Sequence, residues 1–231
     1  MPLFDLTAKA DFPPAERADA EGLLAVGGDL SPRRLLRAYG RGIFPWYSDG
    51  EPILWWSPDP RFILFPTEVH MPRSLKKLLH KKTFQLTFDS AFSEVVDGCA
   101  RSRPDQSGTW ITGEMRQAYI KLHKLGYAHS MEAWKNGTLA GGLYGVALGR
   151  CFFAESMFHL EANASKVVLF ALVRALQKKG FMLIDCQIPS PHLAAWGARS
   201  ITRRQYLELL RSGLSRCTLR GNWGKVLSVE V

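Results

Sequence analysis

The sequence predicts a mixed α/β fold, and three observations support this. Hydrophobic residues make up 46% of the 231 positions, which is enough for a sizeable core in one large or two modest domains. From Arg61 onward, strand-like and helix-like segments alternate. The first 60 residues instead are rich in Pro, Gly and Trp. We therefore expect an α/β sheet domain after a differently built first part.

Residues 31–40 are the clear helix of the first part. Ser31 suits the N-cap, Pro32 suits the first helical position, and Gly40 can close the helix. The segment that follows, GIFPWYSDGEPILWWSPDPR, places tryptophans among prolines. Because each proline removes a backbone donor and restricts its predecessor, this segment predicts an ordered loop connected to short strands.

The second part begins with strands at 62–66 and 84–89 and helices near 71–81, 90–100 and 112–125. Three strands follow, read from AHSMEAWKNG, LAGGLYGVALG and RCFFAESMF, and Asn136-Gly137 predicts a hairpin between the first two. A helix over 163–179 ends at Gly180. It predicts a right-handed crossover between two parallel strands.

The segment FMLIDCQ, residues 181–187, reads as a strand buried on both faces. Side chains alternate along a strand, so we expect Asp185 and Gln187 on one face and Cys186 on the other. A short helix at 192–196 follows, and Thr202 with Gln205 forms a capping box for the last helix.

Glu155, Asp185 and Gln187 form the sharpest candidate site. If Phe153, Glu155 and Met157 share a face, Glu155 sits beside the other two on a nearby strand. A carboxylate in a partly apolar crevice can attract an ammonium group and accept its proton. The alternative is a buried ion pair, for example with Lys166 or Arg174.

Basic residues predict a polyanionic partner, since the net charge is +9. Three stretches contain little or no acid: Arg33, Arg34, Arg37 and Arg41; Arg73, Lys76, Lys77, Lys81 and Lys82; Arg199, Arg203, Arg204, Arg211, Arg216 and Arg220. Such blocks favour a phosphate-backbone surface. Trp46 and Trp110 lie in polar surroundings and could stack on nucleobases, although most tryptophans are core residues.

Several chemistries lack their motifs. The four cysteines are widely spaced, and there is no Walker loop, Gly-x-Gly-x-x-Gly, His-Glu-x-x-His or nucleophile elbow. We expect neither a metal nor a cofactor. No secretory signal and no stretch of about 20 apolar residues is found, so we expect a soluble cytoplasmic protein away from membranes.

The motifs GLLAVGGDLSPRRLLRAYGRGIFPWYSDGEPILWWSPDPR, GTWIT, HSMEAW, FAESMF, NASK and LIDCQ resemble the leucyl/phenylalanyl-tRNA–protein transferase family nearly end to end. The resemblance implies transfer of Leu or Phe, and also Met, from aminoacyl-tRNA to proteins beginning with Arg or Lys, which marks them for degradation. It implies a small domain at 1–60 and a domain at 61–231 similar to the GNAT N-acetyltransferase fold. We expect a monomer.

The resemblance also implies roles for individual residues. Asp185 and Gln187 match the catalytic pair, and Glu155 matches a carboxylate of the same site. Trp46 and Trp110 match the aromatics that hold the terminal adenosine. The pocket for the transferred side chain is implied at Leu143, Phe152, Met157, Leu172 and Ile184. For the tRNA backbone we expect the second basic stretch, Arg73, Lys76, Lys77, Lys81 and Lys82.

Two other functions are open to the sequence. An acetyl-CoA-dependent N-acetyltransferase would share the fold, but we find no Arg/Gln-x-x-Gly-x-Gly/Ala turn to present amides to a pyrophosphate. A non-catalytic RNA-binding module would explain the charge and the tryptophans. It would not explain why Glu155, Asp185 and Gln187 converge.

Overall fold

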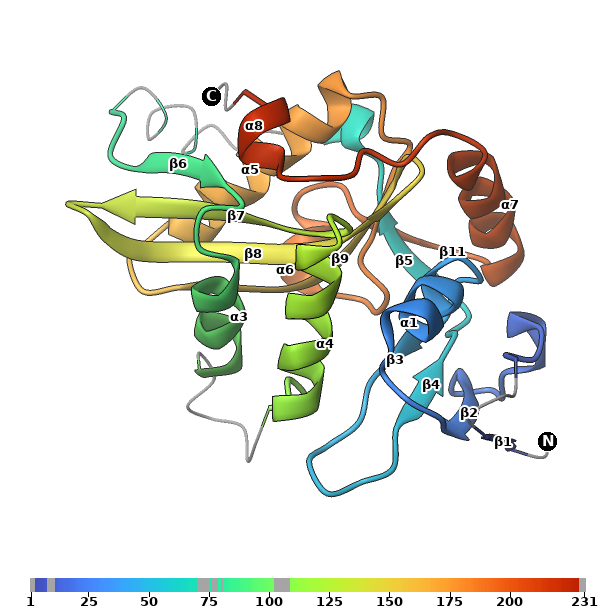
Figure 1. Ribbon diagram of the computed structural model, residues 1–231. Coiled ribbons are helices and arrows are strands. Elements are labelled where there is room, and N and C mark those ends of the chain that lie inside the picture. Colours follow the sequence, from blue (N-terminus) through green and yellow to red (C-terminus); the bar gives the residue numbers. More distant parts are fainter. Residues whose placement is uncertain are drawn as a thin grey trace.

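The computed structural model has the mixed α/β fold that the sequence predicts (Figure 1). It describes residues 3–7, 11–69, 75, 79, 81–101 and 109–228, so most of the helix expected at 71–81 lies outside the described residues. Two sheets follow one another along the chain. Among the helices described, none combines the length and the apolar character needed to span a bilayer.

The first sheet has four short strands. Their order is β1 (Phe4–Leu6), β2 (Leu23–Gly27), β4 (Leu54–Trp56) and β3 (Phe44–Pro45), and a 3-10 turn, η1, covers Ala15–Arg17. The predicted helix is α1 (Pro32–Tyr39). Its N-cap is confirmed, because the Ser31 side chain accepts a hydrogen bond from the backbone N–H of Arg34, and Gly40 is the C-cap.

The second sheet has the strand order β11-β5-β10-β9-β8-β7-β6. Its strands are β5 (Arg61–Leu64), β6 (Gln85–Phe88), β7 (Ala128–Lys135), β8 (Thr138–Leu148), β9 (Cys151–His159), β10 (Leu183–Asp185) and β11 (Arg199–Ile201). The helices after β5 are η2 (Pro66–Glu68), α3 (Phe92–Arg101), α4 (Gly113–Lys124), α5 (Ala164–Lys178), α6 (Pro191–Ala194), α7 (Arg203–Leu214) and α8 (Trp223–Val226). Figure 1 shows α3 and α4 on one face of this sheet and α5 on the other.

Three local predictions are confirmed. Asn136 and Gly137 have φ of 52° and 78° and connect β7 to β8, as a two-residue hairpin turn requires. The strands on either side of α5, β9 and β10, are parallel neighbours. Thr202 and Gln205 form a reciprocal capping box at the start of α7.

A β-bulge interrupts the pairing of β8 with β9. Tyr144 pairs with Ser156, but Gly145 pairs with Ala154, so Glu155 is the extra residue on β9. The bulge changes which face the flanking residues occupy. Phe153 lies in the core beside Tyr39, with ring centroids 4.9 Å apart, whereas Met157 packs toward the α5 side. The expectation that Phe153, Glu155 and Met157 share one face is therefore wrong.

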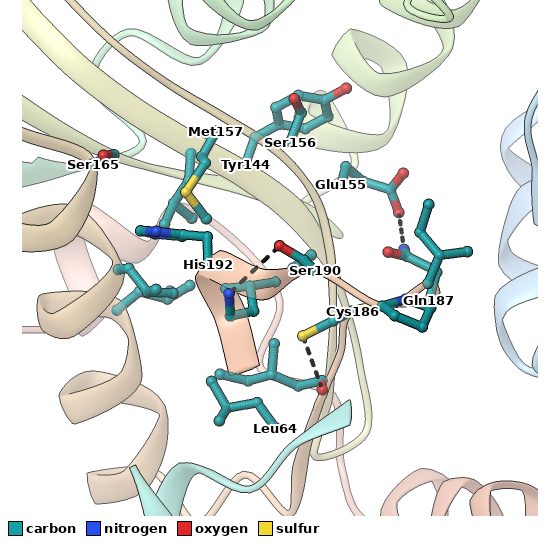
Figure 2. Close-up of a pocket in the computed structure, with 18 of the residues that line it drawn as sticks. Leu64, Tyr144, Glu155, Ser156, Met157, Ser165, Cys186, Gln187, Ser190 and His192 are labelled. Carbon is teal, nitrogen blue, oxygen red and sulfur yellow. Dashed lines mark hydrogen bonds between the residues drawn. The ribbon is translucent and has the colours of Figure 1, made fainter. Parts of the chain in front are cut away.

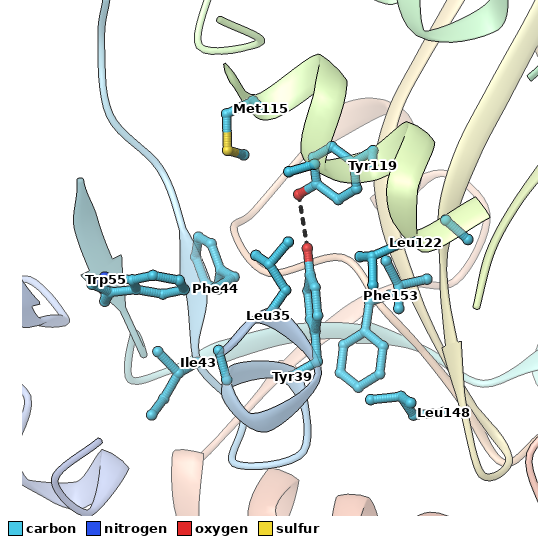
Figure 3. Close-up of a cluster of buried hydrophobic side chains, with 14 of the residues drawn as sticks. Leu35, Tyr39, Ile43, Phe44, Trp55, Met115, Tyr119, Leu122, Leu148 and Phe153 are labelled. Atoms are coloured by element: carbon cyan, nitrogen blue, oxygen red, sulfur yellow. Dashed lines mark hydrogen bonds between the residues drawn. The ribbon is translucent and has the colours of Figure 1, made fainter. Parts of the chain in front are cut away.

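A continuous apolar core joins the two parts of the chain. Its buried members include Tyr39 and Trp55 from the first part and Tyr119 and Phe153 from the second. Figure 3 shows the Tyr39 side chain extending from α1 toward α4, where its hydroxyl meets that of Tyr119. The first part therefore contributes a polar group that reaches the larger sheet. A second core cluster fills the face covered by α5.

Candidate active site

A cavity of about 560 Å³ opens beside the carboxyl end of β10 (Figure 2). This volume falls within the range of small-molecule sites. Its apolar wall is formed by side chains of β5, β8, β9, β10 and α5, and these are Leu64, Leu143, Met157, Leu169, Leu172 and Ile184. Polar side chains also line it, among them Glu155, Ser156, Gln187, Ser190 and His192. The cavity can thus hold an apolar side chain next to groups that bind an amine.

Four of the five expected pocket residues line this cavity: Leu143, Met157, Leu172 and Ile184. Phe152 does not. It is completely buried in the core behind the cavity, with its ring 6.0 Å from that of Trp223. Leu169, which lies one turn before Leu172 on α5, lines the cavity instead. The 3.6-residue period of a helix places Leu169 and Leu172 on the same face, so the sequence could have predicted Leu169 as a lining residue.

Asp185 does not face the cavity but forms a buried ion pair. Its two oxygens accept hydrogen bonds from Arg61 Nε and Nη2 at 2.8 and 2.7 Å, and Tyr206 donates a third at 2.7 Å. Burial disfavours the charge on Arg61, but the attraction of Asp185 outweighs it and raises the pKa of Arg61 above its usual value. The alternative of an ion pair is confirmed, with Arg61 as the partner.

Lys166 and Arg174, the partners considered from sequence, lie elsewhere. Both are exposed on α5, where they bond to Asn163 and Gln177. Arg61 itself carries a signal that sequence reasoning missed. It is a lone arginine at the start of the apolar run RFILF, and a fully buried arginine needs a charged partner.

Gln187 takes its place through an unusual backbone conformation. The strand β10 ends at Asp185, and Gln187 has φ of 58°, in the left-handed region. Its backbone N–H donates to Asp185 Oδ1 at 3.0 Å, and its side-chain amide reaches Glu155 Oε1 at 3.4 Å. Strand alternation therefore stops here, and Cys186 and Gln187 both line the cavity. The expectation that Cys186 points away from the site is wrong.

Glu155 lies in the cavity wall at the bulge, facing Gln187 (Figure 2). Each of its oxygens accepts a hydrogen bond from a tyrosine hydroxyl at 2.7 Å, Oε1 from Tyr39 and Oε2 from Tyr119. Burial raises the pKa of Glu155 to about 7, although both hydroxyls act to lower it. Glu155 and Gln187 are thus brought together at the cavity, while Asp185 supports Gln187 from behind. Sequence reasoning missed both tyrosines.

Trp46 and Trp110 line the same cavity from separate segments. Trp46, just after β3, is 42% exposed. Trp110, just before α4, is half-buried. The other tryptophans of the first part differ, because Trp55 is completely buried and Trp56 donates its indole N–H to the Trp46 carbonyl at 2.7 Å. The cavity therefore has an aromatic rim.

The expected tRNA-backbone residues fall partly outside the described residues. Lys81 and Lys82 are exposed, whereas Arg73, Lys76 and Lys77 are not described. The first basic stretch is less available than its sequence suggests, since Arg37 and Arg41 both pair with Asp11, at 3.1 and 2.7 Å.

Family models and curated relatives that match this chain carry the same family name. The family model described as leucyl/phenylalanyl-tRNA protein transferase matches residues 63–211, and the model of that family's N-terminal domain matches residues 28–59. Three curated relatives carry the name leucyl/phenylalanyl-tRNA–protein transferase. The one from Syntrophus aciditrophicus is 57% identical over 96% of this chain and 94% of its own. Those from Desulfatibacillum aliphaticivorans and Myxococcus xanthus are 55% and 52% identical, each over 96% of this chain and over 96% and 97% of their own.

One solved structure shows a distant resemblance to the chain. L-PGS from Bacillus licheniformis aligns over 74% of this chain and 57% of its own, with 9% identity and a TM-score of 0.40.

Proposed function

The chain belongs to the leucyl/phenylalanyl-tRNA–protein transferase family and is an aminoacyltransferase, and on this premise we propose that it transfers Leu, Phe or Met to proteins beginning with Arg or Lys. The donor is the aminoacyl-tRNA, and the acceptor is the α-amino group of the protein. The product carries a new N-terminal residue that marks it for degradation by the N-end rule. Because charged tRNA is cytoplasmic, the proposal places the protein there, acting as a monomer.

One observation carries this proposal: an apolar cavity, an aromatic rim and a carboxylate–amide pair meet in one place. Leu143, Met157, Leu172 and Ile184 would hold the transferred side chain, and Trp46 and Trp110 would stack on the terminal adenosine. Glu155 and Gln187 then lie where the ester of the donor meets the incoming amine. A carboxylate there also favours an acceptor that carries positive charge.

The chemistry needs no nucleophile from the protein, since the donor is already an activated ester. The neutral amine attacks the ester carbonyl carbon, a C–N bond forms, and the C–O bond to the ribose breaks. The ribose oxygen leaves as a hydroxyl, taking a proton from the attacking nitrogen. Holding amine and ester in contact accelerates such a reaction greatly. We assign Gln187 to orient the amine and Asp185 to fix Gln187, because Asp185 does not line the cavity and its oxygens bind Arg61, Tyr206 and the Gln187 N–H.

The same proposal covers the organisation of the chain. Residues 1–60 form a small domain, and residues 61–231 form a domain similar to the GNAT N-acetyltransferase fold. The change from the first sheet to the second between β4 and β5, and the parallel pair β9 and β10 joined by α5, support this division.

A direct assay tests the function. The protein is incubated with Leu-tRNA and a peptide beginning with Arg, and separately with acetyl-CoA and the same peptide, and the products are weighed by mass spectrometry. We expect the mass of one added leucine with the first donor and no acetylation with the second. Acetylation, or RNA binding without any product, would replace our proposal with one of the two rival functions.

The cavity predicts which amino acids are transferred. Leu, Phe and Met should transfer efficiently, and Lys and Asp should not transfer, because an unpaired charge in the apolar wall is costly. Val and Ile should be slower by roughly 10- to 200-fold, the discrimination that an apolar pocket gives for a small change in shape. Transfer rates from matched charged tRNAs measure this. Ile transferred as fast as Leu would show that the pocket is wider than we infer.

Salt dependence tests the tRNA surface. Replacing Lys76, Lys77, Lys81 and Lys82 with Gln should weaken tRNA binding and flatten the plot of log affinity against log salt. Each lost phosphate contact removes about 0.7–0.9 from the slope. As a control, Lys121→Gln with Lys124→Gln removes two exposed charges from α4. An unchanged slope in the first variant would move the tRNA surface elsewhere.

A further inference from the structure

Tyr39, Tyr119 and Glu155 form a closed triangle of short polar contacts. The two hydroxyl oxygens are 2.8 Å apart, and each is 2.7 Å from a different oxygen of Glu155. The three residues come from α1, α4 and β9, and both tyrosines are completely buried. Figure 3 shows the two hydroxyls facing one another. Neither tyrosine lines the cavity that Glu155 faces.

Counting protons shows what this triangle can do. When Glu155 is ionised, each tyrosine hydroxyl donates its proton to one carboxylate oxygen, and no proton lies between the two hydroxyl oxygens. When Glu155 is protonated, a third proton is available, and each O–H donates to the next around the ring. Every buried oxygen is therefore satisfied in both charge states, and the carboxyl can change its charge without leaving a polar group unpaired.

The surrounding charges agree with a group that titrates near neutral pH. Burial raises the pKa of Glu155 to about 7 against the effect of the two hydroxyls, with Asp185 raising it further and Arg61 lowering it. The pKa values of Tyr39, Tyr119 and Tyr144 lie well above the usual range, chiefly through burial and also through the charge of Glu155. The tyrosines thus keep their protons, and only Glu155 exchanges one.

We propose that Tyr39 and Tyr119 are positioning residues that make Glu155 the proton acceptor for the α-ammonium group of the acceptor protein. This rests on the transferase function proposed above. One N–H bond of the ammonium breaks, its electron pair stays on nitrogen, and the proton passes to a Glu155 oxygen, so that a neutral amine and a carboxylic acid result. The amine then attacks the ester, and Glu155 returns its proton to solvent after the product leaves. Gln187, beside Glu155 in the cavity wall, holds the amine during this transfer.

The pH profile of transfer separates this role from a structural one. Tyr39→Phe and Tyr119→Phe each remove a donor to the carboxylate, so the acid limb of the single-turnover profile should move up by about one pH unit. The rate at pH 7 should fall about 5-fold, because the ionised fraction of Glu155 falls from about one half to about one tenth, and it should recover near pH 9. Glu155→Gln cannot take the proton, so it should be slow at pH 7 and gain rate only where the α-ammonium group loses its proton to solvent, above about pH 8. A rate loss in the tyrosine variants that is equal at all pH values would overturn the proposal.

Tyr127→Phe is the matched control, since Tyr127 lies under Arg220 at the far end of α4 and does not line the cavity. Its profile should equal that of the unchanged protein.

A second measurement needs no activity. With the glutamate side-chain carboxyls labelled with ¹³C, the signal that Glu155→Gln removes is followed by NMR against pH. We expect a midpoint near 7 in the unchanged protein, in agreement with its environment, and a higher one in each tyrosine variant. A midpoint near the ordinary value, with transfer still observed, would overturn the inference alone. If the midpoints are as expected but no transfer from Leu-tRNA is observed, the proposed function is overturned, while the triangle of Tyr39, Tyr119 and Glu155 is supported as a proton-accepting site.

Discussion

Asp185→Ala is expected to lower the free energy of unfolding by about 3–5 kcal/mol, the usual effect of removing one partner of a buried ion pair. Arg61 is 1% exposed, and without Asp185 its charge would stay in the core with neither water nor a counter-ion. Tyr206 would also lose the acceptor of its hydroxyl. For a chain of this length we expect the melting temperature to fall by roughly 10 °C. Urea unfolding and thermal melting measure both quantities.

Two controls make the interpretation firm. Removing both charges, as in Arg61→Met with Asp185→Leu, should recover most of the lost stability, because no unpaired charge remains. Glu208→Ala breaks the surface pair of Arg204 and Glu208, whose side chains are 81% and 56% exposed, and should change stability by at most about 1 kcal/mol. An Asp185→Ala protein as stable as the parent would mean that Arg61 finds water or another anion.

The stability effect also changes how the transfer activity of Asp185 variants is interpreted. The ion pair with Arg61 is not visible in the sequence, which alone suggests that Asp185 is a base at the end of a strand. A loss of transfer in Asp185→Ala would then be taken as evidence for that role. In the structure the same loss follows from the ion pair and from the hydrogen bond that fixes Gln187. Activity of Asp185 variants therefore has to be compared at temperatures where each variant is folded.

Local signals predicted the elements of the fold well. Ser31 and Thr202 cap helices, Asn136-Gly137 turns a hairpin, and the helix between β9 and β10 makes them parallel. Each of these depends on a few neighbouring residues or on chain handedness, so the sequence contains the information.

The details of the site depend on distant contacts instead. The residues next to Glu155 in the sequence do not predict a bulge. The bulge lies opposite Gly145 on the neighbouring strand. A Cβ added at Gly145 would lie 2.2 Å from the Phe153 carbonyl oxygen, so the backbones approach closely there. Likewise, the left-handed backbone of Gln187 is rare for residues other than glycine and depends on the bond to Asp185. Both features change which side chains face the cavity, so strand alternation placed Cys186 and Phe153 wrongly.

The second large effect is expected from Gln187→Gly. The single-turnover transfer rate at saturating donor should fall by roughly 10²–10³-fold, as it does when one preorganised hydrogen-bonding group is removed from a reacting centre. Glycine adopts positive φ without strain, so this variant keeps the backbone conformation and the N–H to Asp185 and removes only the amide. Gln187→Ala should lose the same factor, and Gln177→Ala, on α5 outside the cavity, should lose nothing.

Binding of charged tRNA should stay within about twofold in all three variants, because that affinity comes from phosphate contacts and stacked aromatic rings rather than from the amide. Single-turnover rates and separate tRNA binding curves distinguish the two steps. If Gln187→Gly transfers at the parental rate while Gln187→Ala is slow, only the backbone of residue 187 matters. The amine would then have to be oriented by Glu155 alone, which faces the same part of the cavity.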